Sequence, residues 1–341
     1  MALHYGVGMG RTLPIGEVVP HVKLAEDLGY EHATFIDSQA LSRDCVVMMS
    51  LAAANTRRIR IGPGVTQPYT RHLSVLANSV ATIDELSGGR ALLGIGAGMS
   101  ATGVLGRQPR PLDELATAVE FFRAYTAGKE ATWQGTTVRS EWSRRQIPVI
   151  IGADGPKGMR QAARIADGVF VPAVRPDVFR WRVPRLTEGA AAGGRDLKDV
   201  QVWVRTMVCV EDDLDRARDE VRSYAATCAF SLYLGVLRWP TADAEELKGL
   251  LPASLVDEVT RLGKRYDYYQ HEKRGAPHAA DLSNEAIDSF VFCGPPSRCI
   301  ERIQELRRAG VDRISMVLYA LSDKKRAMRR FVEEVYPHVA Q

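Results

Sequence analysis

The sequence lacks the cysteine and histidine patterns that would indicate a disulfide framework or a metal site. Its five cysteines are an odd number without a C-x-x-C pair, and its seven histidines include no H-x-x-x-H pair. No dense acidic cluster indicates a calcium or magnesium site. The G-x-S-x-G and G-x-x-x-x-G-K-S/T motifs are also absent, which disfavours a serine hydrolase and a P-loop enzyme.

Long hydrophobic runs and a large excess of one charge are missing as well. No stretch approaches the roughly 18 apolar residues of a membrane-spanning helix. Residues 1–10 lack the basic segment and apolar run of a secretion signal. The 45 basic and 41 acidic residues are interleaved and the net charge is +4, so no basic stripe for nucleic acid is expected. We therefore expect a cytoplasmic protein with reduced cysteines that binds neither membranes nor nucleic acid.

The sequence does contain a regular alternation of short apolar runs and longer segments of helical period. This alternation is typical of βαβ units and a parallel sheet. Eight near-continuous apolar runs favour a closed barrel over a doubly wound open sheet, which more often has about five or six strands. We therefore predict a (β/α)8 TIM barrel forming a single domain over residues 1–341. The predicted strands cover 4–10, 32–37, 58–66, 91–97, 147–152, 168–172, 200–210 and 311–318.

A polar segment at about 212–292 interrupts this alternation. It is too long for a simple loop and is patterned in several helical pieces, so we predict a helical insertion between strands 7 and 8, beside the barrel rim. The run FVFCGPP at its end predicts a short extra strand before a helix that begins at Pro295 or Pro296. Four aromatic residues of the insertion fit a core or an interface better than a substrate pocket: Trp239, Tyr266, Tyr268 and Tyr269.

Enzymes with this fold build their active sites from the loops that follow the strands, so the residues there form the candidate site. The second strand ends in FIDSQ, which places Asp37 and Ser38 at the rim as hydrogen-bonding groups that include a titratable carboxyl group. Asp37 is the best candidate for a polar contact in the active site. The alternative is an ordinary loop with an exposed carboxylate.

The third and fourth strands end in glycine-rich turns. The third continues as GPGVTQPYTRH, where a glycine beside a β-branched residue is typical of a bulge, and where we expect His72 to be structural. The fourth continues as GIGAGMSATG. Gly94, Gly96 and Gly98 remove side chains at alternate positions, so a flat ring could lie against the backbone. Tight packing at a corner of the barrel is the alternative.

The fifth strand leads into a helix whose N-terminus is a candidate anion site. Gly155 could cap this helix and Pro156 suits its first turn, while Lys157 and Arg160 could add positive charge. Free backbone N–H groups and the helix dipole would attract a phosphate there. Asp154, an acid in the same turn, must point away or cap the helix itself. A capped helix with nothing bound is the alternative.

Three of these stretches together resemble a known family. The run VATIDELSGGRALLGIGAG at 80–98, with GPGVTQPYTRH and IDSQ, is similar to the bacterial luciferase-like oxidoreductase superfamily. Its nearest branch is that of the coenzyme F420-dependent enzymes, which includes methylenetetrahydromethanopterin reductase. The resemblance covers roughly 4–175, returns at 294–318 and is weak through the insertion. The ELSGGR element is fairly specific for the superfamily and poorly specific for cofactor or substrate.

The resemblance implies a barrel with the ring of a cofactor over the strand ends, and it implies a non-proline cis peptide in the bulge behind that ring. The residues it assigns are Asp37 and Ser38 facing the ring, the bulge Gly64, Val65 and Thr66, the ring border Gly96, Ala97 and Gly98, and the phosphate site Gly155, Pro156 and Lys157. This chain departs from relatives that oxidise alcohols or sugar phosphates, because Ser38 and Met99 stand where those tend to carry a histidine or carboxylate. The proton donor that those relatives usually carry is therefore missing at these two positions.

The resemblance implies a redox enzyme. We favour an F420-dependent oxidoreductase that transfers a hydride between reduced deazaflavin and a small organic substrate, since Arg107 and Arg110 would suit the acidic tail of F420. The alternatives are an FMN-dependent monooxygenase, which uses reduced flavin and O2, and a non-catalytic flavin-binding protein. A flavin or F420 reductase would supply the reduced cofactor, and a homodimer is the expected assembly.

Overall fold

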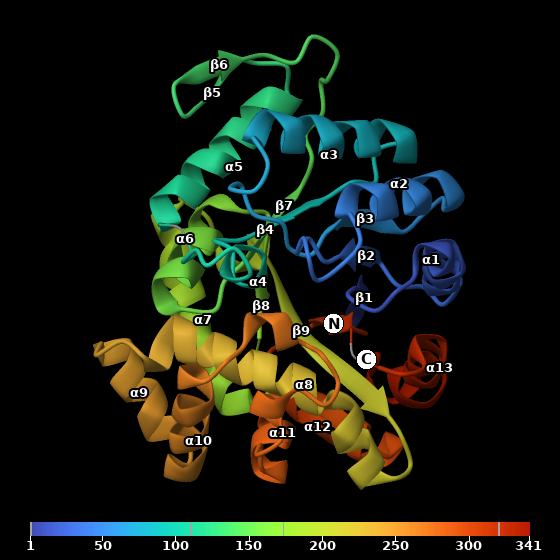
Figure 1. Cartoon of the computed structure of the whole chain (residues 1–341), viewed down its shortest axis with the longest axis vertical. Coiled ribbons are helices and arrows are strands. Elements are labelled where there is room, and N and C mark those ends of the chain that lie inside the picture. The colour runs from blue at the N-terminus through green and yellow to red at the C-terminus, as the bar shows by residue number, and fades with distance from the viewer. Residues whose placement is uncertain (1, 110, 173, 320) are drawn as a thin grey trace.

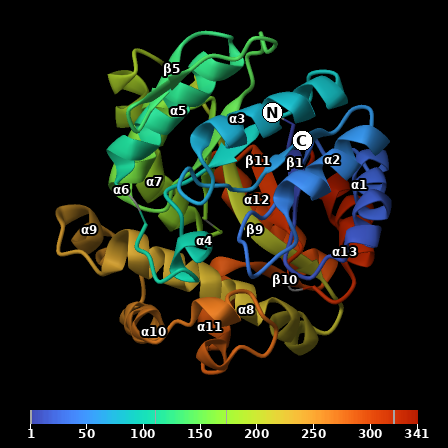
Figure 2. The same cartoon turned by 45° about the horizontal axis from the view of Figure 1, so that its top comes forward.

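The computed structural model describes residues 2–109, 111–172, 174–319 and 321–341, and its centre is a barrel of parallel strands (Figure 1, Figure 2). In those residues the barrel strands are β1 (His4–Met9), β2 (His32–Phe35), β3 (Arg60–Pro63), β4 (Leu93–Ile95), β7 (Val149–Gly152), β8 (Gly168–Val171), β9 (Gln201–Val210) and β11 (Arg313–Val317). The sheet order is β3-β2-β1-β11-β9-β8-β7-β4, with parallel pairing between neighbours. Parallel bridges from Ile61 to Ala91 and from Thr66 to Ile95 join its ends. The predicted (β/α)8 barrel is confirmed.

Helices connect the strands and surround the barrel (Figure 2). Up to β9 they are η1 (Ile15–Glu17), α1 (Val18–Asp27), α2 (Cys45–Asn55), α3 (Leu73–Ser87), α4 (Ser100–Gly103), α5 (Leu112–Thr126), α6 (Pro156–Ile165), α7 (Pro176–Ala192) and η2 (Leu197–Asp199). After β11 they are α13 (Lys324–Arg330), η6 (Phe331–Val335) and α14 (Tyr336–Val339). A hairpin of β5 (Ala131–Trp133) and β6 (Thr136–Val138) precedes β7 and was not predicted from the sequence. In the described residues no helix is long and apolar enough to cross a membrane.

The segment after β9 forms the predicted helical insertion. It contains α8 (Leu214–Leu232), the π-helical turn η3 (Tyr233–Leu237), α9 (Ala242–Leu250), α10 (Ala253–Lys264), η4 (Tyr268–Gln270), η5 (Pro277–Ala279) and α11 (Asn284–Phe290). The predicted extra strand is β10 (Phe292–Gly294), which pairs in parallel with the end of β9, and α12 (Pro296–Arg308) follows it. Figure 1 shows α8 to α11 gathered on one side of the barrel.

The aromatic residues of the insertion divide into a partly buried group and an exposed group. Tyr266 stacks on Phe230 with 3.8 Å between ring centroids, and Tyr268 meets the same ring edge-on. The two tyrosines thus pack against the apolar core, to which Phe230 belongs. Trp239 and Tyr269 are instead half-exposed or more, at 50% and 59%.

Side chains fill the lower half of the barrel, near the amino ends of the strands. Leu92, Ile150, Phe170 and Trp203 form one buried layer there. His32 completes it, since its ring lies 4.5 Å from that of Trp203 and its Nε2 is 3.0 Å from Ser315 Oγ. Burial lowers the pKa of His32 to about 3, because the interior disfavours the charged imidazolium. The lower half is therefore a closed, uncharged core, as expected for this fold.

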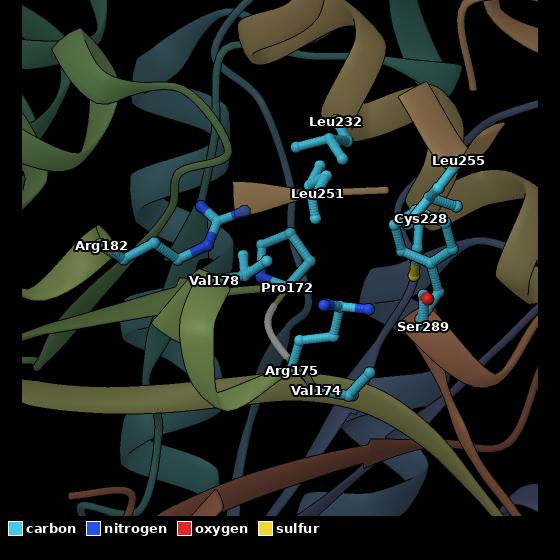
Figure 3. Close-up of a pocket in the computed structure, with 11 residues that line it drawn as sticks. Pro172, Val174, Arg175, Val178, Arg182, Cys228, Leu232, Leu251, Leu255 and Ser289 are labelled. Carbon is cyan, nitrogen blue, oxygen red and sulfur yellow. The ribbon is translucent and has the colours of Figure 1, made fainter. Parts of the chain in front are cut away.

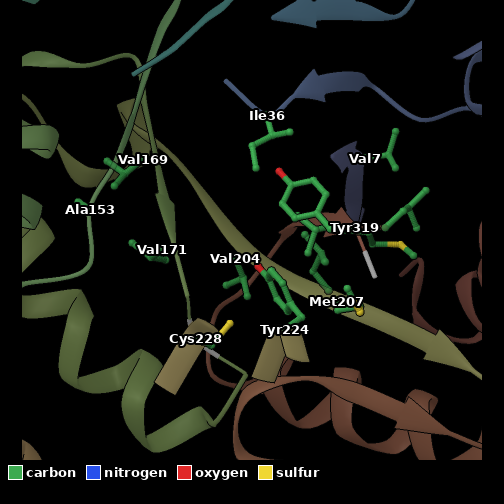
Figure 4. Close-up of a cluster of buried hydrophobic side chains, with 14 of the residues drawn as sticks. Val7, Ile36, Ala153, Val169, Val171, Val204, Met207, Tyr224, Cys228 and Tyr319 are labelled. Atoms are coloured by element: carbon green, nitrogen blue, oxygen red, sulfur yellow. The ribbon is translucent and has the colours of Figure 1, made fainter. Parts of the chain in front are cut away.

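Glycines dominate the upper half of the barrel interior. A Cβ atom added at Gly8 or Gly64 would approach the guanidinium of Arg205, at 2.9 and 3.2 Å. A Cβ atom added at Gly94 or Gly152 would approach the side chain of Val65, at 3.4 and 3.5 Å; that residue is itself only half-buried. These glycines therefore leave room for the side chains of Arg205 and Val65 in the upper half of the barrel. Figure 4 shows part of the apolar cluster beside it, with Val169 and Val171 on one side and Val7 on the other.

The turn after α3 is tied to its neighbours by one arginine at the amino-terminal end of the barrel. Gly88 ends α3 in the left-handed conformation, with a φ of 71°. Arg90 then donates to the carbonyl oxygens of Ala53, Thr56, Ile59 and Ser87. Those residues belong to the C-terminal end of α2, the approach to β3 and the end of α3, so this ELSGGR turn is a structural clamp far from the rim.

Candidate active site

The bulge after β3 lies at the centre of the rim. The peptide bond between Gly64 and Val65 is cis, as the resemblance implied. Gly64 N donates to the Phe35 carbonyl at 2.7 Å, and Thr66 N donates to the Gly94 carbonyl at 2.9 Å. The bulge is thus fixed between β2 and the strand on its other side, and it turns the side chain of Val65 into the barrel.

Two side chains that the sequence analysis did not single out hold the bulge from inside the barrel. Arg205, in the middle of β9, donates to the Gly64 carbonyl oxygen at 2.8 Å, and the hydroxyl of Tyr319 donates to the same oxygen at 3.1 Å. Burial raises the pKa of Tyr319 to about 12, so its hydroxyl stays protonated. One signal was available: Arg205 is a lone charge within the apolar run VQVWVRTMVCV, where a cation needs a special reason.

Asp37 supports the other side of the bulge. This residue is buried, and its Oδ2 accepts from Thr66 Oγ1 and from Arg71 Nη1, both at 2.6 Å. Arg71 also donates to Asp44, at 3.0 Å. Burial lowers the pKa of Arg71, but these bonds to two carboxylates outweigh that effect and hold it above the ordinary value. Asp37 is therefore a paired hydrogen-bond acceptor that holds Thr66 in place.

Ser38 and the residue after it tie the end of β2 to the loop after β4. Ser38 Oγ lies 2.6 Å from Ser100 Oγ, and Gln39 Nε2 donates to the Ala101 carbonyl at 2.6 Å. The predicted ring border at Gly96, Ala97 and Gly98 adjoins this contact. These contacts hold the end of β2 against the start of α4.

The three glycines at and after β4 are required for different structural reasons. A Cβ atom at Gly94 would lie 2.2 Å from the Pro63 carbonyl oxygen, so tight packing explains that glycine. Gly98 has a φ of 85°, which favours glycine by conformation. At Gly96, however, the nearest atom to an added Cβ would be Val65 Cγ2 at 3.2 Å. A side chain at Gly96 would extend over Val65, and its absence leaves the face of Val65 uncovered.

The predicted phosphate site is covered in part by the insertion. Gly155 caps α6 and Pro156 begins it, as predicted, and a Cβ atom at Gly155 would lie 2.4 Å from the carbonyl oxygen of Gly235 in η3. Asp154 does not cap the helix; its carboxyl group is buried, and burial raises its pKa. Close backbone packing therefore suffices to explain Gly155, whether or not an anion binds.

The positive charges proposed for the cofactor are only partly available. Arg160 donates to Glu188 at 2.6 Å and to Asp243 at 3.2 Å, so it serves as a link between α6, α7 and α9. Lys157 and Arg107 are exposed, and in the described ranges neither forms an ion pair. Arg110 lies outside the described residues. His72 caps α3 by accepting from Ser74 N at 3.3 Å, which confirms its expected structural role.

A small cavity opens on the other side of the rim, after β8 (Figure 3). Leu232, Leu251 and Leu255 of the insertion face Pro172 across it, and Arg182 borders one end (Figure 3). Its volume of about 20 Å³ holds roughly one water molecule and no substrate. In the described parts of the chain, no group of three or more histidine, cysteine and acidic side chains could hold a metal ion.

This geometry can be compared with known proteins. The profile of the luciferase-like monooxygenase family matches residues 2–313. The chain belongs to this family. Its resemblance to the F420-dependent branch is also confirmed: a 5,10-methylenetetrahydromethanopterin reductase of Archaeoglobus fulgidus is 30% identical over 98% of this chain and 99% of the relative.

Two solved structures superpose on this protein over nearly its whole length. The coenzyme F420-dependent tetrahydromethanopterin reductase of Methanopyrus kandleri superposes with a TM-score of 0.77 at 26% identity, covering 99% of this chain and 100% of that one. An F420-dependent secondary alcohol dehydrogenase superposes with a TM-score of 0.76 at 19% identity, with both chains fully covered. At that identity the second comparison concerns the fold alone.

Proposed function

We propose that this protein is an F420-dependent oxidoreductase that transfers a hydride between the reduced deazaflavin and an organic substrate with a C=N, C=C or C=O group. The observation that carries the proposal is the full-length similarity to reductases of this branch, 30% identity over 98% of the chain. The glycines that pack around Val65 at the rim support it.

The rim fits the flat ring of such a cofactor. Gly96 leaves the half-buried Val65 as a platform, while Asp37, Arg205 and Tyr319 fix the bulge that carries it. When bound, the deazaflavin supplies a two-electron hydride donor. A rigid platform aligns ring and substrate, which is the main requirement of a hydride transfer. We propose that the residues in contact with the cofactor and substrate are Asp37, Ser38, Gly64, Val65, Thr66, Gly96, Ala97, Gly98, Gly155, Pro156 and Lys157.

We further propose that the substrate is a methylene-bridged tetrahydropterin, the class named for the archaeal relatives. A carbon that bridges two nitrogens becomes a methyl group when it gains one hydride, and the nitrogen it leaves gains one proton. The chain must therefore orient the pterin over the ring and supply a proton. The exposed Lys157 and Arg107 would hold the phosphate and acidic tail of the cofactor.

The assembly is also a proposal. Val47 and Val75 are 50% and 55% exposed on α2 and α3, two helices that pack together, and they support a homodimer through this face. An F420 reductase in the same cytoplasmic compartment would regenerate the reduced cofactor. Light scattering of the wild-type protein and of a Val47→Glu/Val75→Glu variant tests the dimer, and a wild-type monomer would refute it.

The experiment that tests the function is a titration of the purified protein with F420 and, separately, with FMN, followed by fluorescence anisotropy. We expect micromolar affinity for F420, followed by oxidation of reduced F420 when a methylene-bridged tetrahydropterin is added. Preference for FMN would make the protein a monooxygenase of the luciferase-like type. Binding of neither cofactor would refute the redox proposal.

The proposed phosphate site is tested with a separate variant. Replacing Gly155 with a bulky residue would force its Cβ against Gly235, so loss of binding would not separate packing from ligand contact. Lys157→Met is the better change, because this side chain is exposed and its loss leaves the packing intact. We expect weaker binding of F420 with an unchanged melting temperature, and the exposed Lys23→Met variant as a matched control should bind normally.

A further inference from the structure

The reaction proposed above needs a proton, and Asp37, Ser38 and Met99 at the rim do not supply it. Hydride addition to a C=N or C=O carbon leaves an electron pair on the nitrogen or oxygen, which must then be protonated. Asp37 is paired with Arg71, and Ser38 and Met99 carry no acidic proton. An inference about this proton rests on the proposed hydride transfer.

One carboxyl group outside the rim loops is placed to provide it. Glu272 follows η4 in the insertion and is 3% exposed. Its φ is 58°, in the left-handed region that residues with a side chain seldom adopt. Backbone strain of this kind concentrates at functional sites, where the surroundings impose it.

The surroundings of Glu272 do impose this conformation. Arg11, in the loop after β1, donates to the carbonyl oxygens of His271 and Tyr269, at 2.9 Å for the latter. The hydroxyl of Tyr266 lies 2.6 Å from His271 Nδ1 on the other side. The barrel and the insertion thus hold the loop between them, and the carboxyl group is fixed at their junction.

One oxygen of the carboxyl group has no partner within the described part of the chain. In the described residues its Oε2 is buried without a hydrogen-bond partner, and its Oε1 is 3.5 Å from His271 Nε2. A buried acceptor without a partner is costly, which a ligand that bonds to it would relieve. The titratable and charged groups that act on it electrostatically come from β9, the loops after β1 and β11, α8 and the η4 region: Arg205, Arg11, Tyr319, Tyr224, Cys228, Tyr266 and His271.

Hydrogen bonds connect the loop of Glu272 to the residues around the bulge: Arg11 donates to the carbonyl oxygen of His271, and the hydroxyl of the next residue, Thr12, donates to the carbonyl oxygen of Tyr319 at 3.0 Å. Arg205 and Tyr319 are the residues that bond to the Gly64 carbonyl oxygen, behind the platform at Val65. Tyr224 lies beside them, with 6.2 Å between its ring centroid and that of Tyr319. Figure 4 shows the hydroxyl of Tyr319 turned toward Ile36 and that of Tyr224 toward Val204. The carboxyl group therefore lies where the loop after β1 and the segment after β11 meet the insertion.

The pKa of Glu272 is suitable for a general acid. Burial raises the pKa of Glu272 to about 8, although Arg205 and Arg11 act in the opposite direction. Burial also lowers the pKa of His271 to about 3, so the neighbouring imidazole is neutral and provides no counter-charge. At neutral pH the carboxyl group holds its proton.

We propose that Glu272 is the general acid of the reaction. As the hydride forms a C–H bond at the electrophilic carbon, the π electron pair moves to the nitrogen or oxygen. The O–H bond of Glu272 breaks and an N–H or O–H bond forms on the substrate. In a methylene-bridged pterin the same proton goes to the nitrogen whose C–N bond breaks. Glu272 is left as a carboxylate and regains a proton from water before the next turnover.

The test is the isosteric Glu272→Gln variant, with Glu220→Gln as the control. Glu220 is also buried, but it accepts from Arg274 and Ser322 away from the bulge. For Glu272→Gln we expect unchanged F420 affinity, a kcat lower by about 100-fold or more, and loss of the alkaline limb of the pH–rate profile. Glu220→Gln should keep the wild-type kcat and profile while losing stability.

An infrared titration provides a readout without turnover. The cofactor-free wild-type protein should show a protonated carboxyl band that disappears near pH 8 and is missing in Glu272→Gln. A Glu272→Gln variant with wild-type kcat and alkaline limb would overturn the proposal, as would a band that titrates below pH 6. If Glu272→Gln fails to fold, Glu272→Asp should retain partial activity with a displaced alkaline limb, and an undisplaced limb would overturn it. Failure of the wild-type protein to bind F420 would instead refute the proposed function, and this role with it.

Discussion

Replacement of Arg90 by methionine should destabilise the protein without changing the active site. Among the described residues, the Arg90 side chain donates five hydrogen bonds, to Ser87 O, Ile59 O, Thr56 Oγ1 and O, and Ala53 O, at 2.6–3.1 Å. Methionine keeps the apolar stem but provides no donor. Four carbonyl groups near α2, α3 and β3 then lose a partner.

The expected cost follows from these bonds. A hydrogen bond to a charged donor contributes about 1.5–3 kcal/mol when buried, but Arg90 is only half-buried and water can replace part of the loss. Burial also lowers the pKa of Arg90, so the folded protein already carries a desolvation cost for this cation. We therefore expect a decrease of about 3–5 kcal/mol in the free energy of unfolding.

Urea unfolding followed by tryptophan fluorescence measures this decrease. The exposed Arg329→Met variant is the control, and it should change the free energy by less than about 0.5 kcal/mol. Below the unfolding transition, Arg90→Met should bind F420 with wild-type affinity, because the clamp lies at the opposite end of the barrel from the rim. A decrease below about 1 kcal/mol would refute the assigned clamp.

Other predictions concern the rim. Gly96→Ala should lower the affinity for F420, because the new methyl group would cover Val65 at 3.2 Å. Its melting temperature should stay close to that of the wild type. An unchanged affinity in the anisotropy titration would refute the role of Val65 as a platform. Asp37→Asn should cost about 1–3 kcal/mol in urea unfolding and weaken cofactor binding, because Arg71 loses one charged partner; equal stability of both proteins would contradict this. The pKa of Glu272 rises from 4.5 to about 8 on folding, so the stability it contributes is fully present below pH 4.5 and falls as pH rises through 8, by about 5 kcal/mol in all. Urea unfolding of wild type and Glu272→Gln at several pH values measures this difference, and parallel curves would refute the raised pKa.

The fold could be predicted because the barrel strands are local apolar runs separated by helical segments. The hairpin of β5 and β6 was missed, although Gln134 and Gly135 form its two-residue turn with φ values of 48° and 80°. A glycine in a short turn between β-branched residues is the pattern of such a hairpin, so ATWQGTTV did contain the signal.

The site could be predicted only in part. Asp37 and the Gly64 bulge follow strands that are apparent in the sequence, and strand ends meet at one rim. The contact between Tyr319 and Gly64 joins residues 255 positions apart, which no local pattern encodes. Arg160 could not be distinguished from a phosphate ligand for the same reason, because its partners Glu188 and Asp243 are 28 and 83 positions away.

The glycines of the upper barrel have a consequence for how this enzyme can change over time. A side chain at Gly64 would collide with Thr34, and one at Gly94 would collide with the Pro63 carbonyl oxygen, so packing excludes substitutions at these positions. The insertion instead contributes side chains such as Leu232 and Leu251 to the other side of the rim. A lineage that takes a new substrate would therefore change the insertion, while packing keeps the glycines of the bulge as they are.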